Sequence, residues 1–390
     1  MHSFNKAIVK RRICIVAHAA YGALSGGIRG HIGGVERQTT LTARWLAQQG
    51  YSVSLVTWDE GQPADQIIDG VRVIKLCRQD AGWPGVRFLH PRWSSLIQAL
   101  GKANADVYYQ NCAEYVTGQV ALWCKLHHRR FVYSVASDPD CDPDLPKMRS
   151  SRERVLYRFG LRNAATVIVQ TRAQQEMLRQ GFGVQSEILA MPCPGPDMPN
   201  VPSLEERRPR SVLWIGRVAP VKQLEVLLDI AAAAPDLSFE VIGPLDDSPY
   251  VRSLVERAEK LSNVRLQGAV HRVDMPGCYA GGAVLCCTSA YEGFPNTFLE
   301  AWSHGVPVVS TVDPDGLITR FGLGRVGHTP NELLAALRSL LEDPVLWREA
   351  SSNARSYFLE THDAKKVFPL FEKILLGLSS VVEKPMELPE

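Results

Sequence analysis

Residues 283–302 read AVLCCTSAYEGFPNTFLEAW, and this stretch predicts a strand followed by a helix. The apolar run Ala283–Cys287 is typical of a buried parallel strand. A helix is expected to begin near Pro295 or Asn296 after a short loop, because proline is favoured in the first helical turn. The unpaired N–H groups and partial positive charge of such a helix start favour a bound phosphate.

The same alternation of strand and helix runs outward through both halves of the chain. In the second half, strands are expected at 211–215, 238–242, 264–267, 283–287 and 307–310, with helices at 223–234, 250–261, 297–304, 332–341 and 346–358. In the first half, strands are expected at 13–17, 52–57, 106–109, 130–135 and 166–170, with a glycine-rich loop at 22–34 and a helix at 35–49. This order predicts an α/β fold with two Rossmann-like domains facing each other across a cleft. Ligands of open parallel sheets bind at the carboxyl ends of the strands.

The division between the domains is placed at a proline-rich segment. Residues 191–196 read MPCPGP, and the polar stretch 203–210 follows soon afterwards. We therefore expect an N-terminal domain at 1–195 and a C-terminal domain at 196–362. The last helical pattern, 364–376, is amphipathic, and the tail 379–390 has little to bury and is expected to be mobile.

Bulk composition restricts the class of protein. A chain of 390 residues exceeds what one hydrophobic core usually serves. The formal net charge of +2 argues against a nucleic-acid binder that relies on bulk charge. Neither a membrane-spanning run nor a secretory signal is expected, and the nine scattered cysteines suggest free thiols in a reducing, cytoplasmic compartment.

Two glutamates flank the predicted start of the helix. Glu292 precedes it and Glu300 lies within it, with seven residues between them. Two carboxylates in contact with phosphates would repel them, so they are better suited to accept hydroxyl groups of sugars at either end of a diphosphate. On the residues alone the plainer alternative is favoured, in which Glu292 caps the helix and Glu300 lies on a solvated face.

The segment Glu292–Trp302, followed by Gly305–Ser310, resembles the E-x7-E segment of the retaining family 4 glycosyltransferases, which have the GT-B fold. The resemblance implies that Glu292 lies against the donor sugar and that Glu300 holds the ribose hydroxyls. It further implies contacts of Phe294, Asn296 and Thr297 with the diphosphate or the transferred sugar. It also implies a C-terminal helix, 363–378, that crosses back to the N-terminal domain.

A second motif, residues 214–222, reads WIGRVAPVK. Arg217 offers a planar fork for phosphate oxygens and Lys222 a point charge, although a solvated basic loop is the commoner meaning of such a pair. The motif, which includes Gly216, matches the arginine–lysine pair that neutralises the leaving diphosphate in the same family. The resemblance therefore implies a nucleotide-diphosphate sugar as substrate, with no cofactor and no metal.

The N-terminal half contributes two further candidates. Gly33 and Gly34 directly precede a helix and resemble the glycine loop of the family that meets the donor phosphate. Where the family often has a histidine that touches the donor sugar, this chain has Ala136. Asp138 could take over a sugar or acceptor contact, or it is simply a turn residue before Pro139.

Residues 149–162 combine arginines with apolar side chains in a helical pattern. Such a helix can lie on an anionic membrane near a lipid-linked acceptor, or it can pack on its own domain with the arginines in water. The sequence thus predicts a cytoplasmic, retaining, metal-independent hexosyltransferase-like enzyme. Its acceptor would be a saccharide or a lipid-linked acceptor in polysaccharide or glycolipid assembly. The alternatives are a nucleotide-sugar epimerase of GT-B fold and a donor-binding relative that is not an enzyme.

Overall fold

The computed structural model describes residues 11–26, 33–196 and 201–378. The chain divides into two compact units, one made of Met1–Leu189 with Phe368–Glu390, the other of Ala190–Val367. The predicted tail 379–390 lies outside the described residues, as do residues 27–32 of the predicted glycine-rich loop. Within the described residues, no helix is long and apolar enough to span a bilayer.

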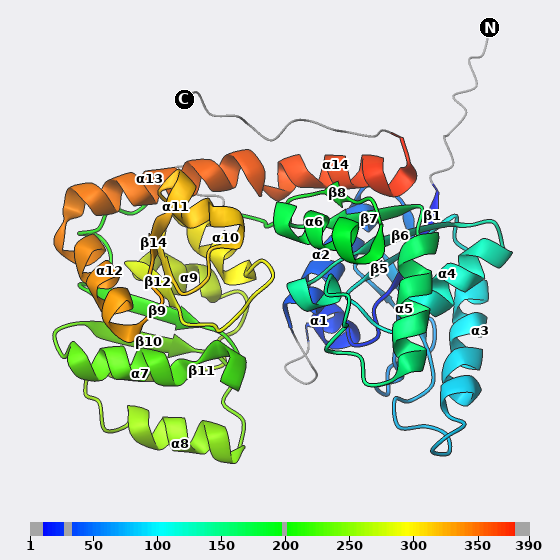
Figure 1. Ribbon diagram of the computed structural model, residues 1–390, viewed down its shortest axis with the longest axis horizontal. Coiled ribbons are helices and arrows are strands. Elements are labelled where there is room, and N and C mark those ends of the chain that lie inside the picture. The colour runs from blue at the N-terminus through cyan, green and yellow to red at the C-terminus, as the bar shows by residue number, and fades with distance from the viewer. Residues whose placement is uncertain (1–10, 27–32, 197–200, 379–390) are drawn as a thin grey trace, which may run out of the picture. The chain divides into compact units, whose positions relative to one another are not determined.

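Unit 1 is built on an eight-stranded sheet of order β3-β4-β2-β1-β5-β6-β7-β8. Its strands are β1 (Arg12–Val16), β2 (Ser52–Thr57), β3 (Ile67–Ile68), β4 (Val71–Lys75), β5 (Val107–Asn111), β6 (Arg130–Ser134), β7 (Thr166–Val169) and β8 (Glu187–Ile188). All neighbours pair in parallel except β3 and β4, which are antiparallel. Parallel pairs need crossover connections, and most of those in this sheet are helices, which Figure 1 shows around it. Strands β2 and β4 are instead joined through residues 58–70, which contain β3.

The helices of unit 1 are α1 (Tyr21–Ser25), α2 (Gly34–Gln48), α3 (Ser94–Ala103), α4 (Val116–Leu126), α5 (Ser151–Asn163) and α6 (Arg172–Phe182). The predicted glycine-rich loop 22–34 thus begins with a short helix, α1, whose Leu24 side chain is buried. Gly26, at a φ of 71°, ends this helix after about one turn. Helices α4 and α5 approach closely at Gly118 and Gly160, where an added Cβ atom would clash with the backbone of the other helix.

Unit 2 is built on a six-stranded parallel sheet of order β11-β10-β9-β12-β13-β14. Its strands are β9 (Ser211–Ile215), β10 (Ser238–Ile242), β11 (Val264–Gly268), β12 (Val284–Cys287), β13 (Val308–Ser310) and β14 (Gly324–Val326). Its helices are α7 (Leu224–Ala233), α8 (Pro249–Ala258), α9 (Met275–Gly281), α10 (Asn296–Ser303), α11 (Leu317–Phe321), α12 (Pro330–Glu342) and α13 (Pro344–Thr361).

Two hydrophobic cores pack against the sheet of unit 2. One core is supplied mainly by α7, α8 and α12, and the other by α9, α10, α11 and α13. Side chains of β9 contribute to both cores, because successive residues of a strand point to opposite faces: Trp214 enters the first and Leu213 the second. Unit 2 is thus a doubly wound sheet, and its loops at the carboxyl edge are free to carry a site.

The unit boundaries differ from the predicted ones at 195 and 362. Met191 and Cys193 pack in a core of unit 2, and the backbone N–H of Cys193 donates to the carbonyl of His362 at 2.9 Å. The first boundary therefore falls at Leu189, before the proline-rich segment. The last helix, α14 (Ala364–Leu376), begins in unit 2 and continues in unit 1 from Phe368, whose ring stacks on Trp45 at 4.8 Å.

Candidate functional site

Two loops of unit 2 leave neighbouring strands at the carboxyl edge of the sheet. Strand β9 leads into residues 216–222, and β12, its neighbour, leads into residues 288–295. The loops are bonded to each other, because Ala290 N–H donates to the carbonyl of Val221 and the hydroxyl of Thr288 donates to that of Lys222, each at 2.8 Å. The two sequence motifs therefore form one structural unit.

Glu292 lies within this pair of loops and does not cap α10. Its Oε1 atom contacts the ammonium group of Lys222 and accepts a hydrogen bond from the hydroxyl of Ser289 at 2.6 Å. The side chains of Glu292 and Lys222 are only 16% and 30% exposed. The Oε2 atom accepts no bond from the described residues. The geometry thus offers one carboxylate oxygen for an outside hydroxyl, next to a cation.

Glu300 is buried on α10, with 8% of its surface exposed, so it does not lie on a solvated face. Its Oε2 atom accepts a hydrogen bond from the hydroxyl of Tyr279 at 2.7 Å, and its Oε1 atom contacts the guanidinium group of Arg272. Burial, followed by the charge of Glu300, raises the pKa of Tyr279 well above its ordinary value, so this hydroxyl stays a donor.

Arg272 and Tyr279 were not singled out from the sequence. Arg272 lies in the loop after β11, and Tyr279 lies on α9. Neither residue forms a local motif with Glu300, because contacts 28 and 21 residues apart in the chain arise only from the fold. A lone arginine in a loop gives no periodic signal.

The other residues of unit 2 that were predicted to contact the nucleotide sugar differ in their exposure and in the groups they leave for a ligand. Arg217 is exposed and lies near enough to Asp246 to contribute to the lowered pKa of that carboxyl, after the hydrogen bonds from Ser248. Asn296 and Thr297 begin α10 and are half-buried. Phe294 is 8% exposed and packs on His362 and Trp302 at 5.1 and 6.2 Å. Its ring therefore belongs to the core, and only its backbone remains for a ligand.

The backbone of Gly216 lies directly against the backbone of Gly243. A Cβ atom added to Gly243, after β10, would come within 1.8 Å of the Gly216 carbonyl oxygen. Gly216 N–H donates to the carbonyl of Ile242 at 3.0 Å. The N–H of Gly216 is therefore already paired, and its carbonyl lies against Gly243.

In unit 1, Gly33 and Gly34 begin α2. The carboxylate of Glu36 accepts a hydrogen bond from the Gly33 N–H at 2.9 Å and caps the helix. An added Cβ atom at Gly33 would lie 2.5 Å from that carboxylate oxygen. The Gly33 N–H is thus engaged within the chain, and this part of the predicted anion contact is occupied by Glu36.

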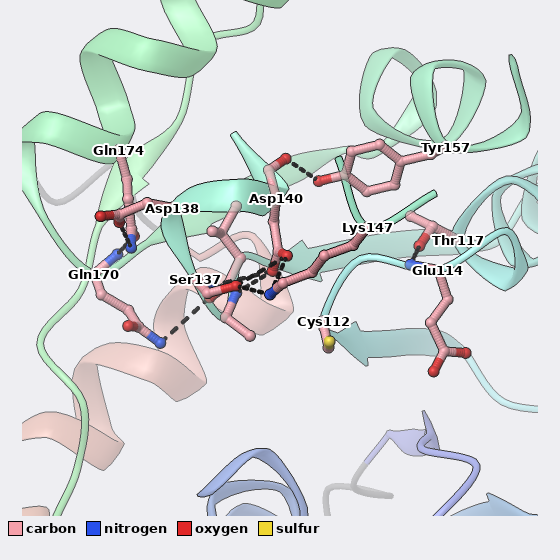
Figure 2. Close-up of polar contacts among 12 residues, drawn as sticks. Cys112, Glu114, Thr117, Ser137, Asp138, Asp140, Lys147, Tyr157, Gln170 and Gln174 are labelled. Carbon is pink, nitrogen blue, oxygen red and sulfur yellow. Dashed lines mark hydrogen bonds and ion pairs between the residues drawn. The ribbon is translucent and has the colours of Figure 1, made fainter. Parts of the chain in front are cut away.

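Asp138 lies in a turn after β6 that other side chains hold in place (Figure 2). Its Oδ1 atom accepts a hydrogen bond from Nε2 of Gln174, which is fully buried on α6, at 2.9 Å. Asp140 fixes the preceding backbone, since its carboxylate accepts from the N–H groups of Ala136 and Ser137 at 3.1 Å. Asp138 is therefore both the predicted turn residue and a half-buried carboxylate of fixed position.

Family models match both units. Residues 33–194 match the model described as "Glycosyl transferase 4-like domain", and residues 209–343 match "Glycosyl transferases group 1".

Two curated relatives illustrate the likeness at the level of sequence. The GtfA subunit of a UDP-N-acetylglucosamine–peptide N-acetylglucosaminyltransferase of Streptococcus gordonii is 29% identical over 49% of this chain and 38% of its own length. The mannosylfructose-phosphate synthase of Agrobacterium fabrum is 25% identical over 82% of this chain and 78% of its own length. The chain spans about two fifths of the first two curated relatives that it matches.

Two solved structures share the fold. Sucrose-phosphate synthase of Thermosynechococcus elongatus has a TM-score of 0.73 at 19% identity, with 95% of this chain and 99% of that chain covered. WaaG, described as a glycosyltransferase involved in lipopolysaccharide biosynthesis, has a TM-score of 0.67 at 19% identity, with 94% and 100% covered. The predicted fold class, α/β with two Rossmann-like domains of GT-B type, is confirmed by this likeness.

Proposed function

We propose that this chain is a retaining, metal-independent glycosyltransferase. Its two parts match glycosyl transferase family models, and its fold is that of sucrose-phosphate synthase and WaaG. It would move a sugar from a nucleotide-diphosphate sugar to a saccharide or lipid-linked acceptor in polysaccharide or glycolipid assembly. The observation that carries the proposal is the set of three contacts made by two carboxylates, Glu292 with Lys222 and Glu300 with Tyr279 and Arg272.

The lone pairs of these carboxylates support contacts with hydroxyl groups. A carboxylate offers about four acceptor sites. Glu300 receives one contact on each oxygen from the chain, so each oxygen retains a lone pair that can accept a hydrogen bond from a ribose hydroxyl. Glu292 has its whole Oε2 atom left for a hydroxyl of the donor sugar.

The cations would act on the leaving group. Lys222 and Arg217 would bind the diphosphate, whose negative charge rises as its bond to the anomeric carbon breaks. Backbone N–H groups at the start of α10, near Asn296 and Thr297, would add fixed dipoles. Retention of configuration would let a phosphate oxygen of the leaving group take the acceptor proton, so Ala136 in place of a histidine is compatible with transfer. Asp138 would then hold a hydroxyl group.

The proposal includes a contact of α5 with the membrane, made by the charges of its arginines and not by insertion of its apolar side. Tyr157, Gly160 and Leu161 of α5 face the core, whereas the exposed residues are Ser151, Arg152, Arg154, Val155, Arg158 and Arg162. The apolar side of this helix is thus used inside unit 1, and the arginines would meet anionic lipid headgroups. Co-sedimentation with vesicles that contain or lack anionic lipid tests this contact, with binding expected only to the anionic vesicles at low salt.

One set of experiments tests the function. Calorimetry with a panel of nucleoside diphosphates and their sugars would find the donor, and NMR of the product would give the anomeric configuration. We expect a product of unchanged configuration with an acceptor. Turnover of donor alone to an epimer would favour an epimerase. Binding without turnover over a broad acceptor panel would favour a donor-binding relative.

A further inference from the structure

A pocket lies within unit 1, at the carboxyl edge of its sheet. It has a volume of about 320 Å³, and the residues that the argument uses are His18, Trp58, Arg92, Glu114, Tyr115 and Arg149. His18 follows β1, Trp58 follows β2 and Glu114 follows β5. Open parallel sheets bind ligands at this edge, and the volume lies at the lower end of the range of small-molecule sites.

His18 presents a buried polar atom that is unpaired in the described part of the chain. The residue is 8% exposed, and its Nδ1 atom lies 3.1 Å from Oε2 of Glu114. A carboxylate at Nδ1 holds the proton there and leaves Nε2 as an acceptor. Nε2 has no partner among the described residues. A buried acceptor of this kind calls for a donor such as a hydroxyl group.

Arg92 presents donors in the same pocket. One of its terminal nitrogens donates to the carbonyl of Gln79 at 2.6 Å, and its buried Nε atom has no partner in the described chain. The guanidinium lies over the ring of Trp58, 5.9 Å from the centroid.

The two carboxylates of the pocket each contact another lining residue. Glu114 pairs with His18, and Glu153 accepts from the backbone N–H of Arg149 at 2.9 Å. In the described ranges, no carboxylate forms an ion pair with Arg92 or Arg149. The guanidinium groups of Arg92 and Arg149 therefore have no carboxylate partner in the described ranges, and each can donate to an anionic ligand even though Glu114 and Glu153 line the same pocket.

We propose that this pocket binds a pyranose ring that bears an anionic group, either a carboxylate or a phosphate. Arg92 takes an oxygen of the anionic group, with Arg149 beside it. Nε2 of His18 accepts a hydroxyl of the ring, and the rings of Trp58 and Tyr115 supply apolar surface. That this sugar is the acceptor of the transfer rests on the proposed function, whereas its binding does not.

The test measures binding of three free sugars to the full chain by calorimetry or saturation-transfer NMR. The probes are glucuronic acid, glucose 6-phosphate and glucose, which separate a carboxylate, a phosphate and a neutral ring. At least one anionic sugar is expected to bind tenfold or more tightly than glucose. Arg92→Gln is expected to remove that preference. His18→Phe is expected to weaken the binding of both anionic and neutral sugars. Arg179→Gln, an exposed arginine of α6 paired with Glu176, is the matched control.

The outcomes separate this proposal from the proposed function. Equal binding of glucose and both anionic sugars would overturn it, as would an unchanged preference in a folded Arg92→Gln variant, with folding checked by thermal melting. If sugars bind as expected while the chain turns over no donor, the proposed function fails and the pocket stands. If the chain transfers sugar to an acceptor but binds glucose and both anionic sugars equally, the pocket proposal fails and the proposed function stands.

Discussion

The hydroxyl of Tyr279 donates a hydrogen bond to Oε2 of Glu300 at 2.7 Å, and both side chains are buried. This contact fixes the orientation of the carboxylate that we assign to the ribose. It links α9 to α10, so the position of Glu300 depends on a residue outside its own motif. Substitutions of Glu300 and Glu292 can separate the binding of the nucleotide from the transfer of the sugar.

Glu300→Ala is expected to weaken binding of the free nucleoside diphosphate, whereas Glu292→Ala is expected mainly to slow transfer from the intact donor. Ribose contacts are the same before and during transfer, but contacts to the sugar can tighten as positive charge develops at the anomeric carbon. Calorimetry measures the first effect and steady-state kinetics the second. Unchanged affinity of Glu300→Ala for the nucleotide would show that the two glutamates are wrongly assigned.

The sequence predicted regular elements well where they carry strong apolar patterns. Strands β9 and β10 and helix α14 have the predicted bounds. Strand β4 (Val71–Lys75) was missed because Arg72 and Lys75 interrupt its apolar run, although Val71 and Val73 are fully buried. The E-x7-E resemblance directed attention to Glu300, but Arg272 was missed because its contact with Glu300 is made only when β11, α9 and α10 come together.

Lys222→Ala and Arg217→Ala are each expected to lower turnover by about a hundredfold or more, the effect of removing one transition-state charge partner. Arg217 is exposed and Lys222 is 30% exposed, so folding is expected to change little. Lys260→Ala, an exposed lysine beyond the end of α8, serves as control for loss of positive charge. Near-normal turnover of either site variant with the true substrates would contradict the assignment of Arg217 and Lys222 to the diphosphate.

Removal of divalent metal is expected to leave transfer unchanged. The proposal gives charge neutralisation of the leaving diphosphate to Arg217 and Lys222 instead of Mg²⁺ or Mn²⁺. Initial rates would be compared after dialysis against EDTA and after addition of each metal at millimolar concentration. A loss of activity that added metal restores would contradict metal independence and leave the rest of the site assignment to be tested by the variants.

Arg207→Met is expected to destabilise unit 2 by about 2–4 kcal/mol, since several buried carbonyls would each lose a charge-assisted donor. The guanidinium is 3% exposed and donates to the carbonyls of Tyr279, Gly282 and His304 at 2.8–3.0 Å. Burial lowers its pKa to about 10, so it remains charged at neutral pH. Denaturant unfolding would measure the loss, with the exposed Arg265→Met as control. Equal stability of the two variants would contradict a structural role for Arg207.

Acid is expected to weaken unit 2 through His362, whose pKa burial lowers from 6.5 to about 4. The ring is 2% exposed, and its Nδ1–H donates to the carbonyl of Met191 at 3.0 Å. A histidine whose folded pKa lies below its unfolded pKa contributes stability above the unfolded value. That contribution falls as the pH drops from about 6.5 towards 4, because the unfolded chain binds the proton first.

Between pH 7 and pH 5 this one group should remove about 2 kcal/mol from the free energy of unfolding. His362→Gln should be less stable than the parent at pH 7, because it loses ring packing against Phe294, but its stability should fall less steeply with acid. Urea unfolding followed by tryptophan fluorescence reports on this region, since Trp302 lies 6.4 Å from the His362 ring. Identical pH slopes for the parent and His362→Gln would mean that His362 takes up no proton on unfolding.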